Sequence, residues 1–278
     1  MHLDGRTALV TGSTDGVGRV VARRLGERGA RVLVHGRDRE RGERLLEELH
    51  ASGSGEGSAF YRADLSSLAE VRSLAEAIER DHDRLDLLIN NAGIGTAGSR
   101  RETSPDGIEL RFAVNYLAGY LLTRRLLPLI LKSAPARIVN VSSLGQHPID
   151  FDDPMLGRRY SGTRAYAQSK LAQIMFTFDL ARELEGTGVT VNCLHPATYM
   201  DTTMVRRAGV APMSSVEEGA EAILHLAIGP DMDGRTGKFF DGLRESRASA
   251  QAYDARARER LRALSERLTE GAASAPHG

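Results

Sequence analysis

The chain of 278 residues has little of three residue types: it contains one cysteine, no tryptophan and only 5% aromatic residues. Because Cys193 is alone, no intrachain disulfide can form, and a reducing compartment is indicated. The chain also lacks a net charge, since Lys plus Arg and Asp plus Glu number 37 each. A neutral chain gives no sign of a nucleic-acid partner or of an anionic membrane surface as a partner.

Long apolar runs are missing as well. The N-terminus lacks the basic and then apolar pattern of a signal peptide. The most apolar stretch, residues 116–132, is interrupted by Arg124 and Arg125 and does not reach the length that a membrane span needs. We therefore expect a soluble, cytoplasmic protein without a membrane anchor.

Short β-rich runs alternate with segments of helical periodicity along the whole chain. Most of the strand candidates are apolar throughout, which is typical of parallel strands buried on both faces. They are residues 7–11, 31–36, 59–64, 85–91, 137–143, 189–195 and 237–242. Helices are predicted near 17–28, 38–51, 67–81, 104–132, 163–185, 215–228 and within 247–268.

This alternation predicts an α/β fold with one doubly wound Rossmann domain. We expect a mostly parallel, seven-stranded sheet with helices on both faces. The domain should span residues 1–270, followed by a disordered tail over 271–278.

A glycine-rich segment follows the first predicted strand and precedes a helix. Glycines let the backbone turn sharply near a pyrophosphate, and the free N–H groups of the helix attract the anion. The spacing G-x-x-x-G-x-G is not that of a Walker loop. A tight turn without a ligand is the alternative, but the position favours dinucleotide binding. The predicted contacts are Gly12, Ser13, Thr14, Asp15, Gly16, Val17 and Gly18.

The second predicted strand ends at Gly36 and is followed by Arg37. An NAD-specific site usually has a carboxylate here, whereas arginine suits the 2′-phosphate of NADP. Arg37 therefore favours NADP over NAD as the cofactor. Arg39 and Arg41 are interpreted as the solvated start of the next helix.

Tyr166 precedes Lys170 by four positions. On a helix this interval places both side chains on one face, one turn apart. A lysine held there favours the phenolate and makes the tyrosine a usable proton donor and acceptor. The same pair also arises on ordinary amphipathic helices, so the remaining motifs have to decide between the two interpretations.

Seven motifs in order make the chain resemble the short-chain dehydrogenase/reductase family. They are TGSTDGVG (11–18), ADL (63–65), NNAG (90–93), VN (114–115), VNVSS (139–143), YAQSK (166–170) and HPA (195–197). The resemblance covers nearly the whole chain. A segment of 22 residues separates Ser143 from Tyr166, and this length is similar to the retinol-dehydrogenase-like and protochlorophyllide-reductase-like branch, whose members often act on bulky apolar substrates.

The resemblance implies a catalytic set. Tyr166 would be the acid/base, Ser143 would orient and polarise the reacting oxygen, and Lys170 would bind the nicotinamide ribose and lower the pKa of the phenol. Asn115 would kink its helix and hold a water for proton relay. Further cofactor contacts are implied at Asp64, Leu65, Asn91, Ala92, Gly93, Tyr166, Pro196 and Thr198.

Two positions after the sixth predicted strand depart from the family pattern. Ala197 replaces the usual glycine after Pro196, and Asp201 stands where a threonine is expected. Thr198, Thr202 or Thr203 would then contact the cofactor, and the sequence leaves this choice open. We interpret residues 197–215 as an adaptable apolar lid over the substrate.

No metal site is predicted. The histidine and aspartates of the long segment (His147, Asp150, Asp152 and Asp153) match no ligand spacing and are interpreted as a solvated capping loop.

The sequence thus favours an NADP-dependent oxidoreductase acting on a carbonyl or an alcohol. A dinucleotide-binding regulator without turnover, and an isomerase or lyase that recycles its cofactor, are the alternatives. Family members often pair helices 104–132 and 163–185 across subunits. A homodimer or homotetramer is therefore expected, with a monomer possible in this branch.

Overall fold

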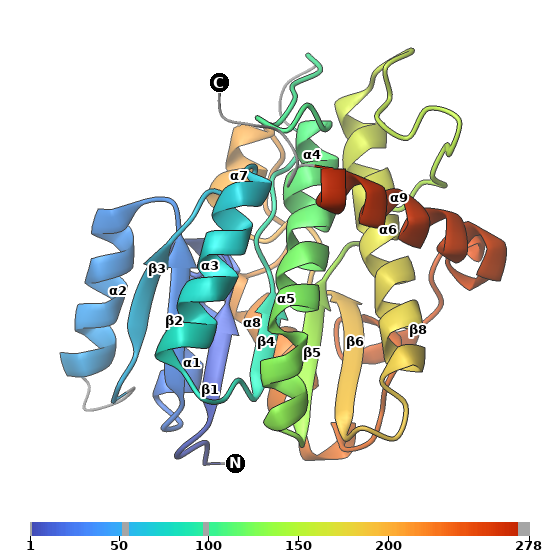
Figure 1. Ribbon diagram of the computed structural model, residues 1–278. Helices are drawn as coiled ribbons and strands as arrows, with labels where there is room; N and C mark the ends of the chain where they lie inside the picture. The colour runs from blue at the N-terminus through green and yellow to red at the C-terminus, as the bar shows by residue number, and fades with distance from the viewer. Residues whose placement is uncertain (1, 52–55, 97–99, 272–278) are drawn as a thin grey trace, which may run out of the picture.

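The computed structural model describes residues 2–51, 56–96 and 100–271 of the chain (Figure 1). Most of the expected tail, residues 272–278, lies outside the described part. The described residues form an eight-stranded sheet in the order β3-β2-β1-β4-β5-β6-β7-β8. All neighbouring strands are parallel except β7 and β8. The strands are β1 (Thr7–Val10), β2 (Arg31–Gly36), β3 (Ala59–Arg62), β4 (Leu87–Asn90), β5 (Ala136–Val141), β6 (Val189–His195), β7 (Phe239–Asp241) and β8 (Arg244–Ser246).

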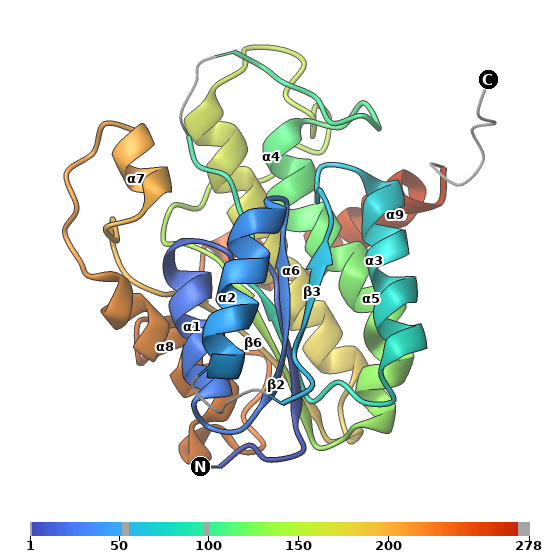
Figure 2. The ribbon, with the colours of Figure 1, turned by 90° about the vertical axis from the view of Figure 1, so that its left-hand side faces the viewer.

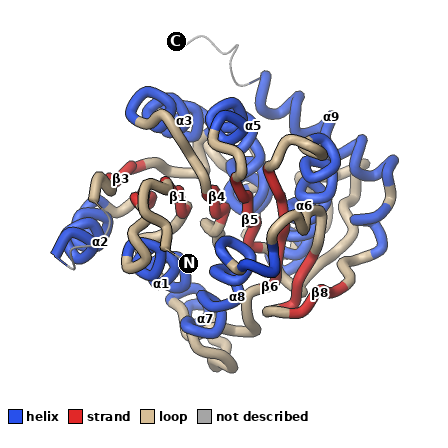
Figure 3. Tube along the Cα trace, turned by 90° about the horizontal axis from the view of Figure 1, so that it is seen from below, coloured by secondary structure: helices blue, strands red, loops and turns tan. Residues whose placement is uncertain are grey.

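Helices cover both faces of this sheet, as Figure 3 shows from below. One face carries α3, α5 and α6, and the other carries α1, α2 and α8. The helices are α1 (Gly16–Gly26), α2 (Arg39–Ala51), α3 (Leu68–Asp81), α4 (Leu110–Phe112), α5 (Ala118–Lys132), α6 (Gly162–Glu183), α7 (Thr203–Arg207), α8 (Val216–Ile228) and α9 (Ala255–Gly271). Short turns of π-helix (Ala113–Leu117) and 3₁₀-helix (Pro230–Met232 and Ala250–Tyr253) complete the described elements.

Each face of the sheet has its own apolar core. Strand residues alternate between the two cores: Leu9 and Leu33 face the α3–α5–α6 layer, whereas Val10 and Val34 face the α1–α8 layer. This double burial explains why the parallel strands are apolar throughout. The fold prediction is confirmed, apart from the number of strands.

The prediction of seven strands was short by one, because β8 had no apolar pattern to reveal it. Its three residues, Arg244–Ser246, are all exposed. The strand forms because Gly242, at φ +56°, starts a two-residue turn that pairs Asp241 with Arg244. Glu245 on this edge strand bonds Arg235 and Lys238, and such charges hinder pairing with another chain.

The helix predicted over 104–132 is divided. Helical structure begins only at Leu110, after a bridge between Thr103 and Glu109 and a turn at Gly107 with φ +76°. The π-turn Ala113–Leu117 then separates α4 from α5. Such a turn inserts an extra residue into the helix, frequently at a functional site.

Helix α9 crosses α6 and the π-turn on the outer side of the sheet (Figure 1). Its Arg258 donates to Asp179 of α6 at 2.8 Å, and Ser265 bonds the hydroxyl of the buried Tyr116 at 2.7 Å. The chain's own helix therefore covers part of the surface for which pairing across subunits is expected.

Candidate active site

The glycine-rich segment 12–18 joins β1 to α1 at the carboxyl end of the sheet. Gly12 and Gly16 adopt φ +64° and +53°, which side chains other than glycine rarely tolerate. A Cβ on Gly12 would lie 2.9 Å from Cα of Ala92, and one on Gly18 would lie 2.4 Å from Nδ2 of Asn91. The glycines are therefore required for the close approach of two loops.

Hydrogen bonds join the same two loops. Asn91 donates through Nδ2 to the carbonyl oxygens of Thr11 at 2.9 Å and Gly12 at 3.2 Å. Thr11 in turn accepts the backbone N–H groups of Asn91 and Ala92 at 3.0 Å each. Asn91 and Ala92, two of the implied cofactor contacts, are thus bonded to the predicted phosphate loop.

His35 supports the glycine segment from β2, and the sequence analysis did not assign it a role. Its Nδ1 accepts the backbone N–H of Gly12 at 3.0 Å, and the backbone N–H of His35 donates to Oγ of Ser13 at 2.9 Å. The side chain is 2% exposed. Burial lowers the pKa of His35 to about 4, so the imidazole stays neutral and can accept. A histidine inside an apolar strand beside a glycine loop was the available signal.

Asp15 links the phosphate loop to α7. Its Oδ1 caps α1 by accepting the N–H of Gly16 at 2.8 Å. Its Oδ2 accepts from Thr203 at 2.9 Å and pairs with Arg41 at 3.2 Å. Arg41 is exposed at the start of α2, as interpreted from the sequence, and in addition pairs with the loop through Asp15. Figure 2 shows α7 at the same end of the sheet as the start of α1.

Arg37 and Asp64 lie together beyond the ends of β2 and β3. Arg37 is 68% exposed, and its guanidinium is 3.8 Å from a carboxylate oxygen of Asp64. Arg39 instead pairs with Glu43 along α2. Leu65 is buried beside Asp64. Among the described residues, Arg37 thus has one ion pair, which is loose and at the surface, and its side chain is accessible to a ligand.

Asn115 occupies the centre of the π-turn. Its Oδ1 accepts the N–H of Ile94 at 2.7 Å, and its Nδ2 donates to the carbonyl of Ile94 at 3.1 Å. A second donation reaches Oγ of Ser169 on α6 at 3.1 Å. The predicted irregular helix is present, and the amide holds the loop after β4 against α6.

Ser143 follows β5 and is buried. Its Oγ accepts the N–H of Gly145 at 3.0 Å, and a hydrogen bond to Tyr166 lowers the pKa of that phenol. The neighbouring Ser142 donates to the backbone carbonyl of Lys170 at 2.8 Å. The two serines thus contact different residues of α6. Ser143, the serine predicted to be catalytic, is the one that contacts Tyr166.

Lys170 lies one helical turn from Tyr166 on α6, as the interval predicts. Its Nζ is 5.8 Å from the centre of the Tyr166 ring. A Cβ on Gly93 would lie 3.6 Å from this Nζ and 3.3 Å from Oδ1 of Asn115. The predicted catalytic residues therefore converge on one place beside the loop after β4.

Burial shifts both titrating groups against their charged forms. It lowers the pKa of Lys170 to about 8 and raises the pKa of Tyr166. The nearby phenol of Tyr199 also raises the pKa of Tyr166, whereas the hydrogen bond from Ser143 lowers it. The net direction for the phenol is upward, and an effect of Lys170 on it stays a prediction.

The lid segment 197–215 begins after the buried His195 and Pro196. Oγ1 of Thr198 bonds Nε2 of His195 at 3.1 Å, so this hydroxyl is directed at β6. Thr202 caps α7 by accepting the N–H of Val205 at 3.3 Å, and its Cγ2 would lie 3.4 Å from a Cβ on Gly16.

These contacts separate the three threonines between which the sequence could not choose. Thr202 and Thr203 lie against the phosphate loop, whereas Thr198 does not share their contacts. Tyr199, between them, adopts φ +44°. For a bulky residue this is a strained conformation of the kind that clusters at functional sites.

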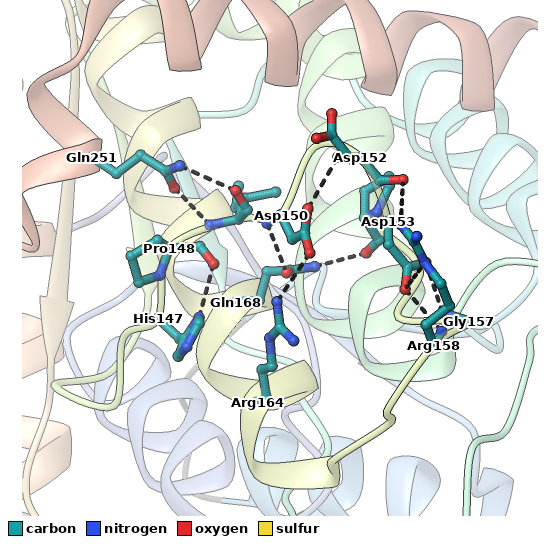
Figure 4. Close-up of polar contacts among 12 residues, drawn as sticks. His147, Pro148, Asp150, Asp152, Asp153, Gly157, Arg158, Arg164, Gln168 and Gln251 are labelled. Carbon is teal, nitrogen blue, oxygen red and sulfur yellow. Dashed lines mark hydrogen bonds and ion pairs between the residues drawn. The ribbon is translucent and has the colours of Figure 1, made fainter.

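The long segment between Ser143 and Tyr166 carries the acidic residues considered for a metal (Figure 4). Asp150 pairs with Arg164 at 3.3 Å, and Asp153 accepts the N–H groups of Gly157 and Arg158 at 2.8 Å each. Within residues 2–51, 56–96 and 100–271, no group of three or more His, Cys, Asp or Glu side chains could hold a metal ion. The carboxylates therefore serve as backbone caps and ion-pair partners.

None of the helices in the described ranges is long and apolar enough to cross a membrane.

The family model for short chain dehydrogenases matches residues 6–211. Human retinol dehydrogenase 13 is 36% identical over 96% of this chain and 85% of its own. Mouse retinol dehydrogenase 14 is 38% identical over 96% of this chain and 86% of its own.

Solved structures agree with the sequence matches. An uncharacterised protein from Mycobacterium paratuberculosis superposes with a TM-score of 0.79 at 31% identity, covering 97% of this chain and 95% of that one. An RhlG/NADP complex from Pseudomonas aeruginosa gives a TM-score of 0.71 at 31% identity, covering 86% and 95% of the two chains. The chain therefore belongs to the short-chain dehydrogenase/reductase family, in its retinol-dehydrogenase-like branch, and is an oxidoreductase.

Proposed function

We propose that the protein is an NADP-dependent oxidoreductase that interconverts a bulky apolar ketone or aldehyde and the corresponding alcohol, with Tyr166 as the acid/base. The convergence of Asn115, Ser143, Tyr166 and Lys170 beside the glycine-rich loop carries this proposal.

The residues present fit a nicotinamide dinucleotide. Gly12 and Gly18 let the phosphate loop approach the loop after β4 more closely than a Cβ would allow, and Gly93 adds no side chain beside Lys170 and Asn115. Asp15 caps the N–H of Gly16, and the next N–H groups in the first turn of α1 would be directed toward a pyrophosphate. A bound nicotinamide would supply or accept the hydride at the carbonyl carbon.

The protein would manage the proton. Oγ of Ser143 accepts the N–H of Gly145 and is hydrogen-bonded to Tyr166. With substrate bound, its one hydroxyl hydrogen would turn toward the substrate oxygen, where negative charge develops during reduction. Tyr166 would deliver its phenolic proton to that oxygen and recover it during oxidation. The ammonium of Lys170 would stabilise the phenolate left behind.

Two observations support NADP. Arg37 is 68% exposed beyond the end of β2, where a 2′-phosphate would accept its guanidinium N–H groups. A related structure is described as an NADP complex, although another relative is described as complexed with NADH. Asp64 and Leu65 would border the adenine, and Thr202 or Thr203 would approach the pyrophosphate more readily than Thr198.

The substrate class rests on exposed apolar side chains near the site. Leu144 follows Ser143, Leu243 lies in the turn after β7, and the lid carries Tyr199, Met204 and Met213. The exposed fraction of Met213 reaches 72%. Exposed apolar groups gathered around a polar centre are expected where an apolar substrate enters.

A homodimer or homotetramer and a cytoplasmic location remain part of the proposal. A regulator without turnover, or an isomerase or lyase, is less favoured because the complete acid/base set is present. Because α9 covers part of the α5–α6 surface, sedimentation of the purified protein is the direct test of its assembly.

Oxidation of NADPH and NADH, followed at the nicotinamide absorbance over aldehydes and ketones graded by size and polarity, tests the function. Turnover that prefers NADPH and rises with apolar bulk is expected. Binding of NADPH without turnover of any carbonyl would instead favour a regulator.

A further inference from the structure

The long segment between Ser143 and Tyr166 is fastened by glutamine side chains (Figure 4). Gln168, buried on α6, accepts the N–H of Asp150 at 3.3 Å and donates to the carbonyl of Pro154 at 2.7 Å. Gln251, in the 3₁₀ turn before α9, accepts the N–H of Ile149 at 2.6 Å and donates to its carbonyl at 3.1 Å. Each amide thus replaces the backbone partners that an irregular segment lacks.

Gln146 makes the same kind of bridge next to the catalytic centre. Its Nε2 donates to the carbonyl of Ser143 at 2.9 Å, and its Oε1 accepts the N–H of Ser249 at 2.7 Å. Between them, Gly145 donates its N–H to Oγ of Ser143. The turn 143–146, which aims the Ser143 hydroxyl, is therefore tied to the segment after β8.

We propose that Gln146 is a positioning residue: its amide ties the turn 143–146 to the C-terminal segment at Ser249 and so aims the Ser143 hydroxyl at Tyr166. Gln251 supports the same arrangement from the neighbouring turn. This inference rests on the proposed function for its catalytic meaning, but the contacts that carry it are independent of the substrate.

The proposal predicts an effect on proton transfer. Ser143 is the hydrogen-bond partner that favours the ionised form of Tyr166. The other groups near this phenol are Lys170, on the same helix, and Tyr199 on the lid. Neither is bonded to Gln146, so releasing Gln146 should change only the contribution of Ser143.

The test compares Gln146→Met, which keeps the shape but loses both hydrogen bonds, with Ser249→Ala, which keeps the backbone N–H. Both full-length proteins are assayed for alcohol oxidation across pH with saturating NADP. Gln146→Met should lower kcat by about fivefold to tenfold and move the rising limb of the profile upward by about half a pH unit, as expected for one weakened hydrogen bond. Ser249→Ala should match the parent protein, and Ser143→Ala should give the larger shift in the same direction.

A loss of kcat in Gln146→Met without movement of the limb would overturn the proposal, since a merely structural defect reduces active protein but leaves the pKa in place. An unchanged profile and rate would overturn it too. If Gln146→Met does not fold, Gln146→Ala serves instead, because it loses both hydrogen bonds without adding a charge near Tyr166. The same upward shift is expected.

A second measurement separates this proposal from the proposed function. The ultraviolet absorbance of tyrosinate is titrated in each protein without cofactor, and the curve of the matching Tyr166→Phe variant is subtracted. The midpoint for Tyr166 should be higher in Gln146→Met than in the parent, even if no alcohol is ever turned over. Coincident midpoints would contradict the positioning role.

Discussion

Lys170 donates its Nζ to the carbonyl oxygen of Val141 at 2.8 Å and stands 5.8 Å from the centre of the Tyr166 ring. The lysine is thus held by β5 rather than by the phenol. Within residues 2–51, 56–96 and 100–271, no hydrogen bond joins the two side chains, so any influence of the ammonium on the phenol acts through space. Such an influence depends on the lysine being charged, and burial lowers its pKa to about 8.

Carbonyl reduction should therefore decline in alkaline solution. The ammonium of Lys170 loses its proton as the pH rises through about 8, and the phenolate left on Tyr166 then lacks its stabilising charge. Lys170→Arg should remove this alkaline decline from the pH–rate profile, since arginine does not deprotonate in proteins. The measurement is kcat/KM for NADPH-dependent reduction across pH. Lys132→Arg, at the exposed end of α5, is the control that should keep the parent profile.

Arg37→Ala should weaken the binding of NADPH but not that of NADH. Loss of a charge-assisted phosphate contact is expected to raise KM for NADPH by about 10- to 100-fold while changing KM for NADH little. Arg39→Ala is the matched control, because Arg39 is equally exposed but pairs with Glu43. Equal losses for both cofactors, or losses as large in the Arg39 variant, would refute the role of Arg37.

Gly18→Ala should disable dinucleotide binding. The new Cβ would lie 2.4 Å from both Nδ2 of Asn91 and the carbonyl oxygen of Gly12, so the two loops must separate. Gly119→Ala is the control within another helix, since a Cβ there would lie 3.5 Å from Cγ of Asn90, an ordinary contact distance. This substitution should stabilise the fold by up to about 1 kcal/mol. Calorimetric titration with NADPH compares the two. Comparable affinity in both variants would contradict the required close approach.

His35 should make the fold sensitive to acid. Its pKa is about 4 in the folded chain against an ordinary 6.5, so the unfolded chain binds the proton first as the pH falls. The stabilisation is complete above about pH 6.5 and is lost toward pH 4, by up to about 3 kcal/mol. His35→Asn, whose amide oxygen can accept from Gly12, should flatten this slope in urea unfolding at graded pH. If the His35→Asn variant kept the pH dependence of the parent, His35 would not be its source. The control His50→Asn, at an exposed histidine, should keep the pH dependence of the parent.

The sequence predicted the layers of the fold well because parallel strands and glycine turns leave strong local patterns. Leu9 and Leu33 illustrate this, since their burial follows from apolar runs alone. Strand β8 left no such pattern, because its residues are exposed and its pairing depends on the turn at Gly242. The start of the long helix was misplaced for a similar reason, since a bridge between Thr103 and Glu109 is a tertiary feature.

The site was predictable where a motif carries both residue type and spacing, as for Tyr166 and Lys170. The HPA motif did not indicate which partners the threonine hydroxyls of the following segment would bond. Thr198 bonds His195, whereas Thr203 bonds Asp15, which lies 188 positions away in the chain. Contacts of this kind depend on how the lid packs. Gln146 likewise bonds Ser249, 103 positions away, and no sequence pattern marks such a contact. The histidine within β2 was a usable signal that the motifs left unassigned.

The rate of hydride transfer in a single turnover, measured for the parent protein and for Tyr166→Phe with the same apolar carbonyl and NADPH, tests the central claim most directly. The phenylalanine keeps the ring but loses the proton donor. The account predicts a fall of about 10²- to 10⁴-fold in the rate. The affinity for NADPH should change far less, since the other cofactor contacts remain. A variant that transfers hydride at the parent rate would contradict the assignment of Tyr166 as the acid/base.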